Sequence, residues 1–419
     1  MKRPMGEGFL SKIGIPAGFA WGYAGLLLFM IGDGVETSFL SRTFFDFGFS
    51  QAQVGAAFTV YGLAAAVGAY LAGALSDLWG PRKVMAIGAA IWLALHLAML
   101  TIALPTRSYA LLSVTYGWRG FGYPLFAYGF MIWLIAGSPK QRLNTALGWF
   151  WFSFTAGYPV IGSLLAARFL SILHPAGLLW LSWLLVGTGA AVALFLIGDQ
   201  TGRLPLRAGG GGSLKDILTG GIAIMFTVPA VGRGAVARVI NTASQFGLWV
   251  FFPIFFTQKL GFSLQQWATL LSIMMGANLA AVIAVGVISD RWSWRKSTAL
   301  LGGVFCALAC LVFYYAPVSA PSNYPIAVVA AAIYGIALAG YVALPPMMTA
   351  QAPDRQGQAM SAYTLGAGAS AAIGPLVGTL FIGSLGIQGV VWIYAALHLA
   401  SAFLCLSITS PGDGKPLAA

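Results

Sequence analysis

Apolar stretches of about 20 residues recur along the whole chain and constrain its fold more than any other feature. A helix of that length spans the hydrocarbon core of a bilayer, which is roughly 30 Å thick. The composition agrees, because 59% of the 419 residues are hydrophobic and only 8% are charged. A soluble protein of this size needs more polar surface. The sequence therefore predicts an all-α polytopic membrane protein.

Twelve spanning helices are predicted, six on each side of a polar linker. They are expected at 18–40, 53–76, 84–104, 109–137, 144–168, 176–198, 232–257, 264–288, 297–316, 324–350, 356–383 and 386–408. The first is too long for a cleavable signal peptide. Segment 199–215 is charged and glycine-rich, which is typical of a linker, and 214–229 is a candidate interfacial helix. We therefore expect two six-helix halves, 1–198 and 230–419, joined by a cytoplasmic linker at 199–229.

A repeat within the sequence supports two related halves. The hinge GALSDLWGPRK at Gly73–Lys83 returns as GVISDRWSWRK at Gly286–Lys296, at an offset of 286 − 73 = 213 residues. The matched pairs are Gly73 with Gly286, Asp77 with Asp290, Arg82 with Arg295, and Lys83 with Lys296. A further match relates Tyr123 to Tyr341 at an offset of 218. Each half is thus expected to repeat one helical architecture.

Lysine and arginine gather on one side of the predicted topology. Of the 22 such residues, 16 fall on the side of the termini and linker, and 2 lie within spans. The opposite side holds four, which are Arg42, Arg107, Arg168 and Lys259. The positive-inside rule therefore predicts cytoplasmic termini and a cytoplasmic linker. It also accounts for the formal net charge of +12, so no nucleic-acid partner is expected.

The residue types that bind metals or perform catalysis are few and scattered. Three cysteines lie in apolar spans, and three histidines stand apart along the chain. These residues are Cys306, Cys310, Cys405, His96, His174 and His398. We expect no disulfide framework, no metal site and no cofactor, and no catalytic set is recognisable. An enzyme is therefore disfavoured.

Three ionisable residues are predicted to lie deep in the bilayer, where charges are costly and usually functional. At about 1.5 Å per residue from the inner helix ends, Asp33 lies roughly 22 Å deep, Glu36 roughly 27 Å and Arg119 roughly 28 Å. An arginine favours the charged form of a nearby carboxylate, and apolar surroundings favour the neutral form. A movable group of this kind can load and release a proton, so these three are the candidates for proton coupling. A permanent structural ion pair is the alternative.

A polar stripe on the seventh span is the candidate solute site. Arg238, Asn241, Gln245 and Trp249 follow one another at spacings of three, four and four, which places them on one helix face. Amides and an indole can bind a hydroxylated solute, whereas Arg238 would favour a carboxylated one. Polar contact between helices is the competing explanation. Further candidates for a midplane site are Tyr123, Tyr128, Trp149, Asn278 and Tyr341.

The hinge pattern G-x-x-x-D-x-x-G-x-R-K between the second and third spans resembles that of the major facilitator superfamily. The resemblance implies a twelve-helix carrier in which Asp77 bonds across the cytoplasmic ends of the halves in the outward-open state. The candidate gate comprises Gly73, Asp77, Arg82, Lys83, Asp290, Arg295 and Lys296. Gly73 is expected to allow close helix approach. The second copy departs from the pattern, because Ser293 stands in the position of Gly80.

Four further motifs are similar to those of the polyol permease family, which includes bacterial ribitol and arabinitol carriers. They are Gly32–Glu36, Gly120–Tyr128, Gly148–Phe152 and Asn241–Gly247. The resemblance implies a proton-coupled importer of linear sugar alcohols in a bacterial inner membrane, and we expect the protein to be a monomer. Its partners would be the solute, protons and the lipid bilayer. The family also covers relatives assigned to organic acids, and an efflux antiporter or a non-transporting sensor are further alternatives.

Overall fold

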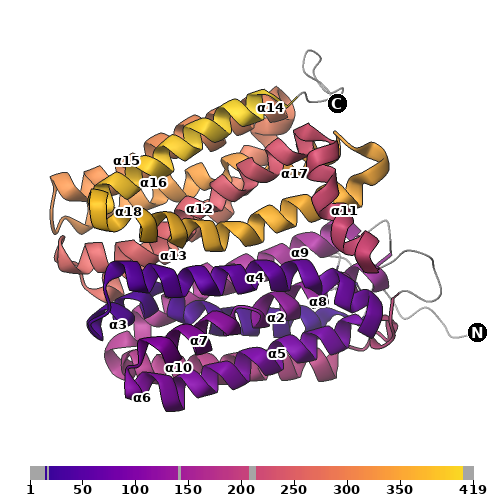
Figure 1. The fold of residues 1–419 in the computed structure, drawn as a ribbon, viewed down its shortest axis with the longest axis horizontal. Helices are drawn as coiled ribbons and strands as arrows, with labels where there is room; N and C mark the ends of the chain where they lie inside the picture. Colours follow the sequence, from indigo (N-terminus) through magenta and orange to yellow (C-terminus); the bar gives the residue numbers. More distant parts are fainter. Residues whose placement is uncertain (1–14, 17, 140–142, 207–213, 409–419) are drawn as a thin grey trace, which may run out of the picture.

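The structure is a computed structural model that describes residues 15–16, 18–139, 143–206 and 214–408. Regular elements in these ranges are all helical (Figure 1). Several sequence-based predictions fall on other residues, namely the N-terminal basic segment, the basic residues at 140 and 142, the glycine run of the linker and the tail after 408. Those predictions lie outside the described residues.

The first half contains a series of helices separated by short turns and breaks. They are α2 (Ala20–Val35), η1 (Glu36–Ser38), α3 (Leu40–Asp46), α4 (Gln51–Trp79), α5 (Pro81–Ala98), η2 (Met99–Ala103), α6 (Leu104–Thr106), α7 (Tyr109–Arg119), α8 (Gly122–Gly137), α9 (Leu143–Thr155), η4 (Ala156–Ile161) and α10 (Gly162–Leu196). The short helix η5 (Thr201–Arg203) follows.

The second half begins after α11 (Leu214–Thr227), a helix in the segment where the sequence predicts an interfacial helix. Its elements are α12 (Pro229–Gln258), α13 (Leu264–Trp292), α14 (Trp294–Ser297), η6 (Thr298–Phe305), α15 (Cys306–Ser319), α16 (Tyr324–Leu338), η7 (Ala339–Tyr341), α17 (Leu344–Thr349), η8 (Pro353–Arg355) and α18 (Gln356–Leu406).

Ten helical segments of the described chain are long and apolar enough to cross a membrane. Two of them, Thr145–Leu196 with 52 residues and Gln358–Leu406 with 49, are too long for one crossing. Each contains a non-helical residue, His174 with φ 56° or Gly386 with φ 63°, at which the chain turns back. The described chain thus confirms the all-helical class with ten such segments, and the count of twelve stays a prediction.

The sequence repeat is visible in the local structure. Ser50 begins α4 with a capping box to Gln53, and Ser263 begins α13 with the same box to Gln266. The hinges differ where their sequences differ. Gly80 has φ 86° between α4 and α5, whereas Ser293 is extended and caps α14 through its side chain. The serine therefore replaces a left-handed glycine turn by a helix cap.

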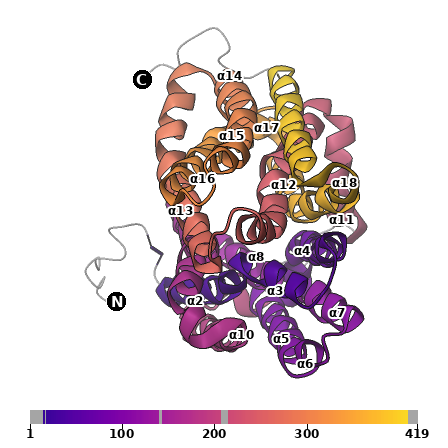
Figure 2. The ribbon, with the colours of Figure 1, turned by 90° about the vertical axis from the view of Figure 1, so that its left-hand side faces the viewer.

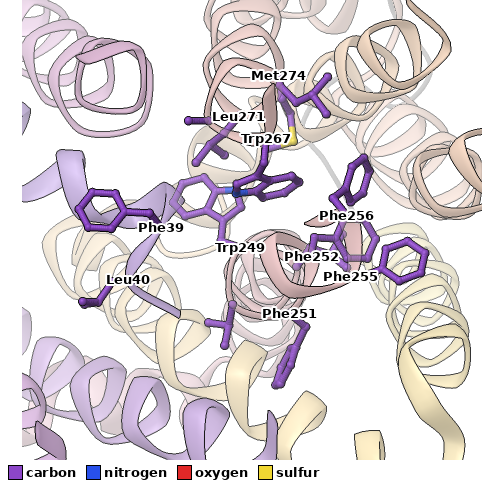
Figure 3. Packing of buried hydrophobic residues seen from close by; sticks show 14 of the residues in the cluster. Phe39, Leu40, Trp249, Phe251, Phe252, Phe255, Phe256, Trp267, Leu271 and Met274 are labelled. Atoms are coloured by element: carbon purple, nitrogen blue, oxygen red, sulfur yellow. The ribbon is translucent and has the colours of Figure 1, made fainter. Parts of the chain in front are cut away.

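The two halves share an apolar core at only one end of the molecule. We call the end that carries the hinge at Gly80 and α11 the linker end, and the opposite end, with α3 and the loop at Gly261, the far end (Figures 1 and 2). At the far end one cluster contains side chains of both halves, among them Phe39, Leu40, Trp249 and Trp267 (Figure 3). Two other clusters, one in each half, contain the buried side chains toward the linker end. The halves are thus packed together at the far end and have separate cores at the linker end.

Close contact between α4 and α18 carries the packing toward the middle of the molecule. A Cβ added to Gly62 would lie 2.1 Å from the carbonyl oxygen of Ala371. Only glycine therefore lets these two helices approach so closely at this point. In contrast, a Cβ at Gly73 would meet no described atom within 4 Å. The close helix approach expected at Gly73 is therefore absent in this structure.

Candidate functional site

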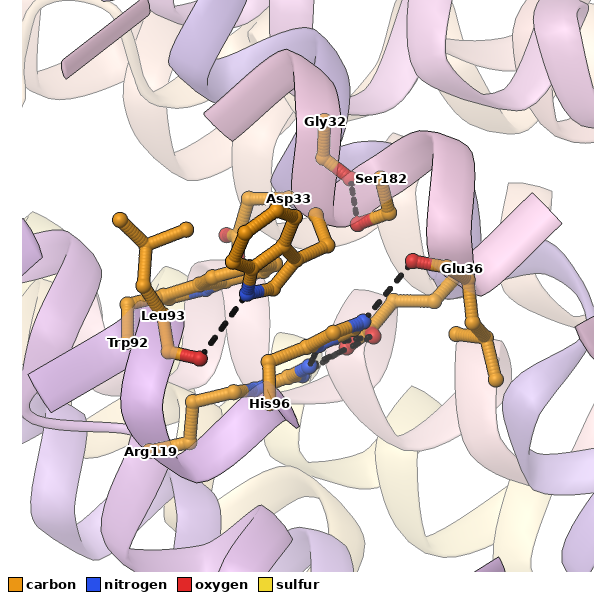
Figure 4. A network of polar contacts seen from close by, with 10 residues as sticks. Gly32, Asp33, Glu36, Trp92, Leu93, His96, Arg119 and Ser182 are labelled. Atoms are coloured by element: carbon orange, nitrogen blue, oxygen red, sulfur yellow. Dashed lines mark hydrogen bonds and ion pairs between the residues drawn. The ribbon is translucent and has the colours of Figure 1, made fainter. Parts of the chain in front are cut away.

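A buried ion pair lies inside the first half, between η1 and α7. Arg119, the last residue of α7, donates from Nη1 to Glu36 Oε2 at 2.8 Å, and its Nη2 bonds to Glu36 Oε1 (Figure 4). Arg119 is 0% exposed, Glu36 4% and Asp33 1%. The structure thus brings together the arginine and the glutamate that were expected at one depth. Two oxygens facing two guanidinium nitrogens form the bidentate arrangement in which such pairs are strongest.

Helix α5 supplies two residues that the sequence analysis missed, Trp92 and His96. Trp92 Nε1 donates to Asp33 Oδ1 at 2.6 Å, and Arg119 Nη1 contacts His96 Nδ1. The Trp92 and His96 rings stack with centroids 4.4 Å apart and planes inclined by 10°. Their spacing of four residues puts both on one face of a spanning helix, which was an available signal. A histidine at bilayer depth was another.

Close packing of the first span on α10 and η4 fixes the position of the two acids. Ser182 on α10 donates to the Gly32 carbonyl at 2.6 Å. A Cβ on Gly34 would lie 1.7 Å from the carbonyl oxygen of Tyr158, so the backbones of α2 and η4 meet directly. The helix then tightens into η1 at Glu36. This change of helix type directs the Glu36 side chain toward Arg119. The backbone contact at Gly34 holds the segment in place.

The cluster contains two carboxylates and a single guanidinium. Arg119 Cζ lies 4.8 Å from the Trp92 ring, 4.9 Å from the Tyr116 ring and 5.7 Å from the Tyr61 ring, all distances at which a cation is attracted to an aromatic face. Asp33 Oδ2 and Arg119 Nε are buried without a hydrogen-bond partner among the described residues. With both acids ionised, one negative charge is uncompensated, which is costly in an apolar interior. The cluster is therefore chemically suited to holding a proton.

The polar stripe on α12 is mostly buried. Arg238 is half-buried, and its Nη1 donates to Thr242 Oγ1 at 3.0 Å and to Asn241 Oδ1 at 3.4 Å. Its Cζ lies 5.0 Å from the Tyr363 ring. No carboxylate of the described residues lies within 4.0 Å of Arg238. Gln245 is buried, and the described chain offers its amide no hydrogen-bond partner. These two side chains thus retain binding capacity.

Tyr158, another residue not found from the sequence, connects the two candidate regions. Its ring lies 6.3 Å from Tyr123 in the first half and 6.1 Å from Trp249 in the second. Trp249 Nε1 is buried without a partner among the described residues. Tyr123 also stacks on Tyr61, which lies over Arg119. An aromatic path therefore joins the stripe on α12 to the buried acids.

The remaining solute-site candidates are not grouped with that path. Asn278 donates to the Gly335 carbonyl at 3.1 Å and ties α13 to α16. Tyr341 bonds to Ser401 and, at 3.0 Å, to His398 Nδ1 inside the second half. Tyr128 is buried against the Trp151 ring, and Trp149 is half-buried. Asn278 and Tyr341 thus hold second-half helices together in this structure.

The hinge residues occupy the linker end. Arg82 Nε donates to the Leu194 carbonyl at 2.9 Å, which ties the start of α5 to α10. Asp290 accepts from Trp294 Nε1 at 2.9 Å. Asp77 is half-buried and Arg295 is likewise partly covered. Lys83 and Lys296 are exposed. The basic residues of both hinges thus lie where the halves have separate cores.

At the far end, Arg42 ties the two halves together. It forms an ion pair with Asp46, with Nη2 at 2.9 Å from Oδ1, and its Nη1 donates across to Thr257 Oγ1 on α12 at 2.6 Å. With the Gln258 amide oxygen turned toward Arg42, that oxygen accepts from Nη2 at 2.6 Å. The sequence identified Arg42 only as an outer-side charge. We call Arg42, Asp46, Thr257 and Gln258 the far-end latch.

Replacing Arg42 by glutamine should shift the molecule toward closure of the linker end. The change removes hydrogen bonds between the halves that are worth about 1 kcal/mol, or roughly a fivefold change in the ratio of two states. A single cysteine introduced as Gly73→Cys in a cysteine-free protein reports the linker end, and its labelling by a maleimide should slow. Arg107→Gln is the control, since Arg107 lies over Phe47 of its own half. Equal labelling rates in both variants would show that the latch does not set the balance.

Comparison with known proteins agrees with this architecture. The long apolar helical segments define a polytopic membrane protein. The chain belongs to the Major Facilitator Superfamily, whose family model matches residues 17–236 and 234–419. It is therefore a transporter and not an enzyme.

Several curated relatives match nearly the whole chain. An alpha-ketoglutarate permease of Bacillus subtilis (strain 168) is 38% identical, covering 96% of this chain and 91% of the relative. A ribitol transporter of Klebsiella pneumoniae is 32% identical, covering 95% and 94%. A D-arabinitol transporter of the same organism is also 32% identical, covering 96% and 95%. The relatives thus include carriers named for polyols and for an organic acid.

Solved structures share the fold at low sequence identity. A bacterial homologue of the human lysosomal transporter Spinster, in an inward-facing and unoccupied conformation, matches with a TM-score of 0.72 and 15% identity, covering 97% of both chains. The nucleoside transporter NupG matches with a TM-score of 0.71 and 14% identity, covering 93% of this chain and 98% of that one. These similarities concern the fold alone.

Proposed function

We propose that the protein is a proton-coupled symporter that imports a small hydroxylated solute by alternating access, with a linear sugar alcohol as the leading candidate. The observation that carries the proposal is the buried cluster of Asp33, Glu36 and Arg119, which holds two acids but only one guanidinium. The relatives named for ribitol and D-arabinitol support the class of solute.

The proton step uses the unequal surroundings of the two acids. Both oxygens of Glu36 are bound by Arg119, whereas Asp33 has one oxygen without a partner in the described chain. A proton on either acid removes the uncompensated charge, and Arg119 then stabilises the acid that remains ionised. Movement of the halves alters these contacts, so the proton can enter from one side and leave on the other. The solute moves in the same cycle.

The solute would bind between the halves, beside the aromatic path. Gln245 offers an amide, Trp249 an indole N–H, and the rings of Tyr158 and Tyr123 offer flat apolar faces. A sugar alcohol presents hydroxyl groups on one edge and C–H groups on the other, so amides and aromatic rings suit it. Binding at this level would place the solute next to the acids that carry the proton.

The orientation follows from the charge distribution. The linker end carries most of the lysine and arginine residues, so we place it in the cytoplasm of a bacterium, with the chain a monomer in the inner membrane. The shared core at the far end would then close the outer side, and the separate cores at the linker end would allow opening toward the cytoplasm.

Uptake into proteoliposomes tests the proposal. Radiolabelled ribitol, D-arabinitol and xylitol would be supplied with and without an inward proton gradient, with alpha-ketoglutarate and a sugar acid in parallel. For one proton per neutral solute, a gradient of one pH unit supports about tenfold accumulation. Accumulation of a polyol only with the gradient is the expected result. Equilibration without accumulation would overturn coupling, and no polyol flux at all would overturn the solute class.

An organic acid is the second candidate, and Arg238 is the observation that favours it. This half-buried guanidinium has no carboxylate partner within 4.0 Å among the described residues. Such a group is suited to bind a solute carboxylate through two parallel hydrogen bonds. The relative named as an alpha-ketoglutarate permease adds support.

The variant Arg238→Gln separates the two candidates. If the solute is an acid, its half-saturating concentration should rise roughly 10- to 150-fold, because charge-assisted hydrogen bonds contribute about 1.5–3 kcal/mol. If the solute is a polyol, that concentration should change by less than about threefold. Arg233→Gln is the control, since five residues turn α12 by about 140° and place Arg233 on another face. A large loss in both variants would indicate damage to α12 and no solute contact.

A further inference from the structure

We propose that His96 is an uncharged positioning residue that keeps Arg119 in the cluster while Glu36 carries the proton. The inference rests on the proposed proton coupling and extends it to a residue of α5. His96 contacts Arg119 through Nδ1, and its Nε2 lies 3.0 Å from the Leu179 carbonyl oxygen. The ring is 0% exposed, so its hydrogen-bond partners are protein groups and not solvent.

The two partners of the ring determine where its hydrogen lies. A guanidinium can only donate hydrogen bonds, so Nδ1 must be the acceptor and carries no hydrogen. A carbonyl oxygen can only accept, so Nε2 must carry the hydrogen and donate it to Leu179. An imidazolium would point an N–H group at the Arg119 guanidinium and place two positive charges together. The geometry thus assigns the neutral Nε2–H tautomer to His96.

Among the described residues, the charged and titratable groups around this ring belong to the same cluster. Glu36 Oε2 lies 3.9 Å from His96 Nδ1, across the guanidinium that both of them contact. Trp92 stacks on the ring and holds Asp33 on its far side. The surrounding elements contribute Asp33 from α2, Glu36 from η1, Tyr61 from α4, Arg119 and Tyr116 from α7, and Tyr158 from η4. His96 is the member of this set that offers a neutral acceptor nitrogen.

That acceptor lowers the cost of protonating Glu36. A protonated Glu36 loses its charge and offers Arg119 a weaker partner, although the guanidinium stays fully buried. The His96 nitrogen remains in place because α5 and the Leu179 carbonyl hold the ring. Without the His96 nitrogen, the buried Arg119 guanidinium would have fewer hydrogen-bond acceptors when Glu36 is protonated. Proton binding should therefore be stronger with His96 than without its acceptor.

Two variants isolate the acceptor nitrogen. His96→Phe keeps a ring to stack on Trp92 but has no acceptor, whereas His96→Asn keeps an acceptor close to the position of Nδ1. Both lose the Nε2–H that binds Leu179, so their difference reports the contact with Arg119. The midpoint of gradient-driven uptake against pH should move about one unit toward acid in His96→Phe, which is tenfold weaker proton binding. His96→Asn should retain the wild-type midpoint, and solute counterflow should persist in both.

Three results would overturn the proposal. A wild-type midpoint in His96→Phe would show that the acceptor is not used. The same shift in both variants would assign the effect to Leu179 or to packing. Loss of uphill uptake in both, with counterflow intact, would make His96 itself the titrating group.

A measurement without transport tests the tautomer and keeps the inference falsifiable if His96→Phe does not fold. Nitrogen-15 NMR of the full-length protein, labelled at its three histidines, gives the protonation of each ring nitrogen. The signal of His96, assigned by its loss in His96→Asn, should show an Nε2–H tautomer between pH 5 and 8. An imidazolium or an Nδ1–H ring would overturn the inference. Absence of gradient-driven uptake in the wild type would overturn the coupling, whereas the NMR result decides the His96 hydrogen by itself.

Discussion

Replacing Glu36 by glutamine should abolish proton-driven accumulation and leave solute exchange in place. The amide cannot take up or release a proton, yet it is close in size to the acid and still accepts a hydrogen bond from Arg119. Accumulation of about tenfold per pH unit should therefore fall to equilibration. Counterflow, in which labelled solute enters in exchange for unlabelled solute, needs no net proton movement and should continue.

Asp354→Asn is the matched control for this experiment. Asp354 is an exposed acid in η8, so the variant removes one carboxylate without touching the buried cluster. Uphill uptake should be unchanged in that variant. If Glu36→Gln also accumulates solute like the wild type, Glu36 forms a permanent structural pair with Arg119. Asp33→Asn would then be the next variant to measure.

Replacing Arg119 by methionine should strongly destabilise the protein. The change leaves Glu36 buried without its partner and removes the cation from three aromatic faces. Removal of one member of a buried ion pair typically costs about 3–5 kcal/mol. Thermal unfolding of the purified protein in detergent should show a large fall in the transition temperature.

The double variant Arg119→Met with Glu36→Gln provides the decisive comparison. With both charges gone, no ion is left unpaired, so the double variant should be more stable than Arg119→Met alone. Arg107→Met is the control, because this surface arginine lies over one ring of its own half and should change stability by less than about 0.5 kcal/mol. Additive losses in the double variant would mean that the two residues do not interact energetically.

The ion pair could be predicted from the sequence because helix rise is nearly constant. Counting residues from the helix ends places Glu36 and Arg119 at one depth, and the structure brings them within hydrogen-bond distance. Depth does not fix the rotation of a helix about its axis. His96 and Trp92 were missed for that reason, since their partners lie on neighbouring helices. Rotation likewise turns Tyr341 toward His398.

The fold was predictable where it depends on local patterns. The serine caps at Ser50 and Ser263 follow the repeat because a capping box involves only four consecutive residues. The open space around Gly73 was not predictable, because it depends on which ends of the halves are in contact. The abruptness of the breaks at His174 and Gly386 was not predictable either, since a single non-helical residue separates the helices on each side.

Because the halves share an apolar core only at the far end, temperature should shift the balance between the conformations of the protein. Opening that end would expose to water apolar side chains of the shared cluster, among them Trp249, whose ring packs on Tyr158 of the first half. The linker end, in contrast, would close through the charged hinges at Asp77 and Asp290. Hydrophobic association weakens on cooling. The stability of contacts between charged groups changes with temperature for another reason, namely the cost of removing the charges from water. In the proposed transport cycle, the two closed forms would therefore be held by forces that respond unequally to cold, and cooling alone should favour the form that is open at the far end.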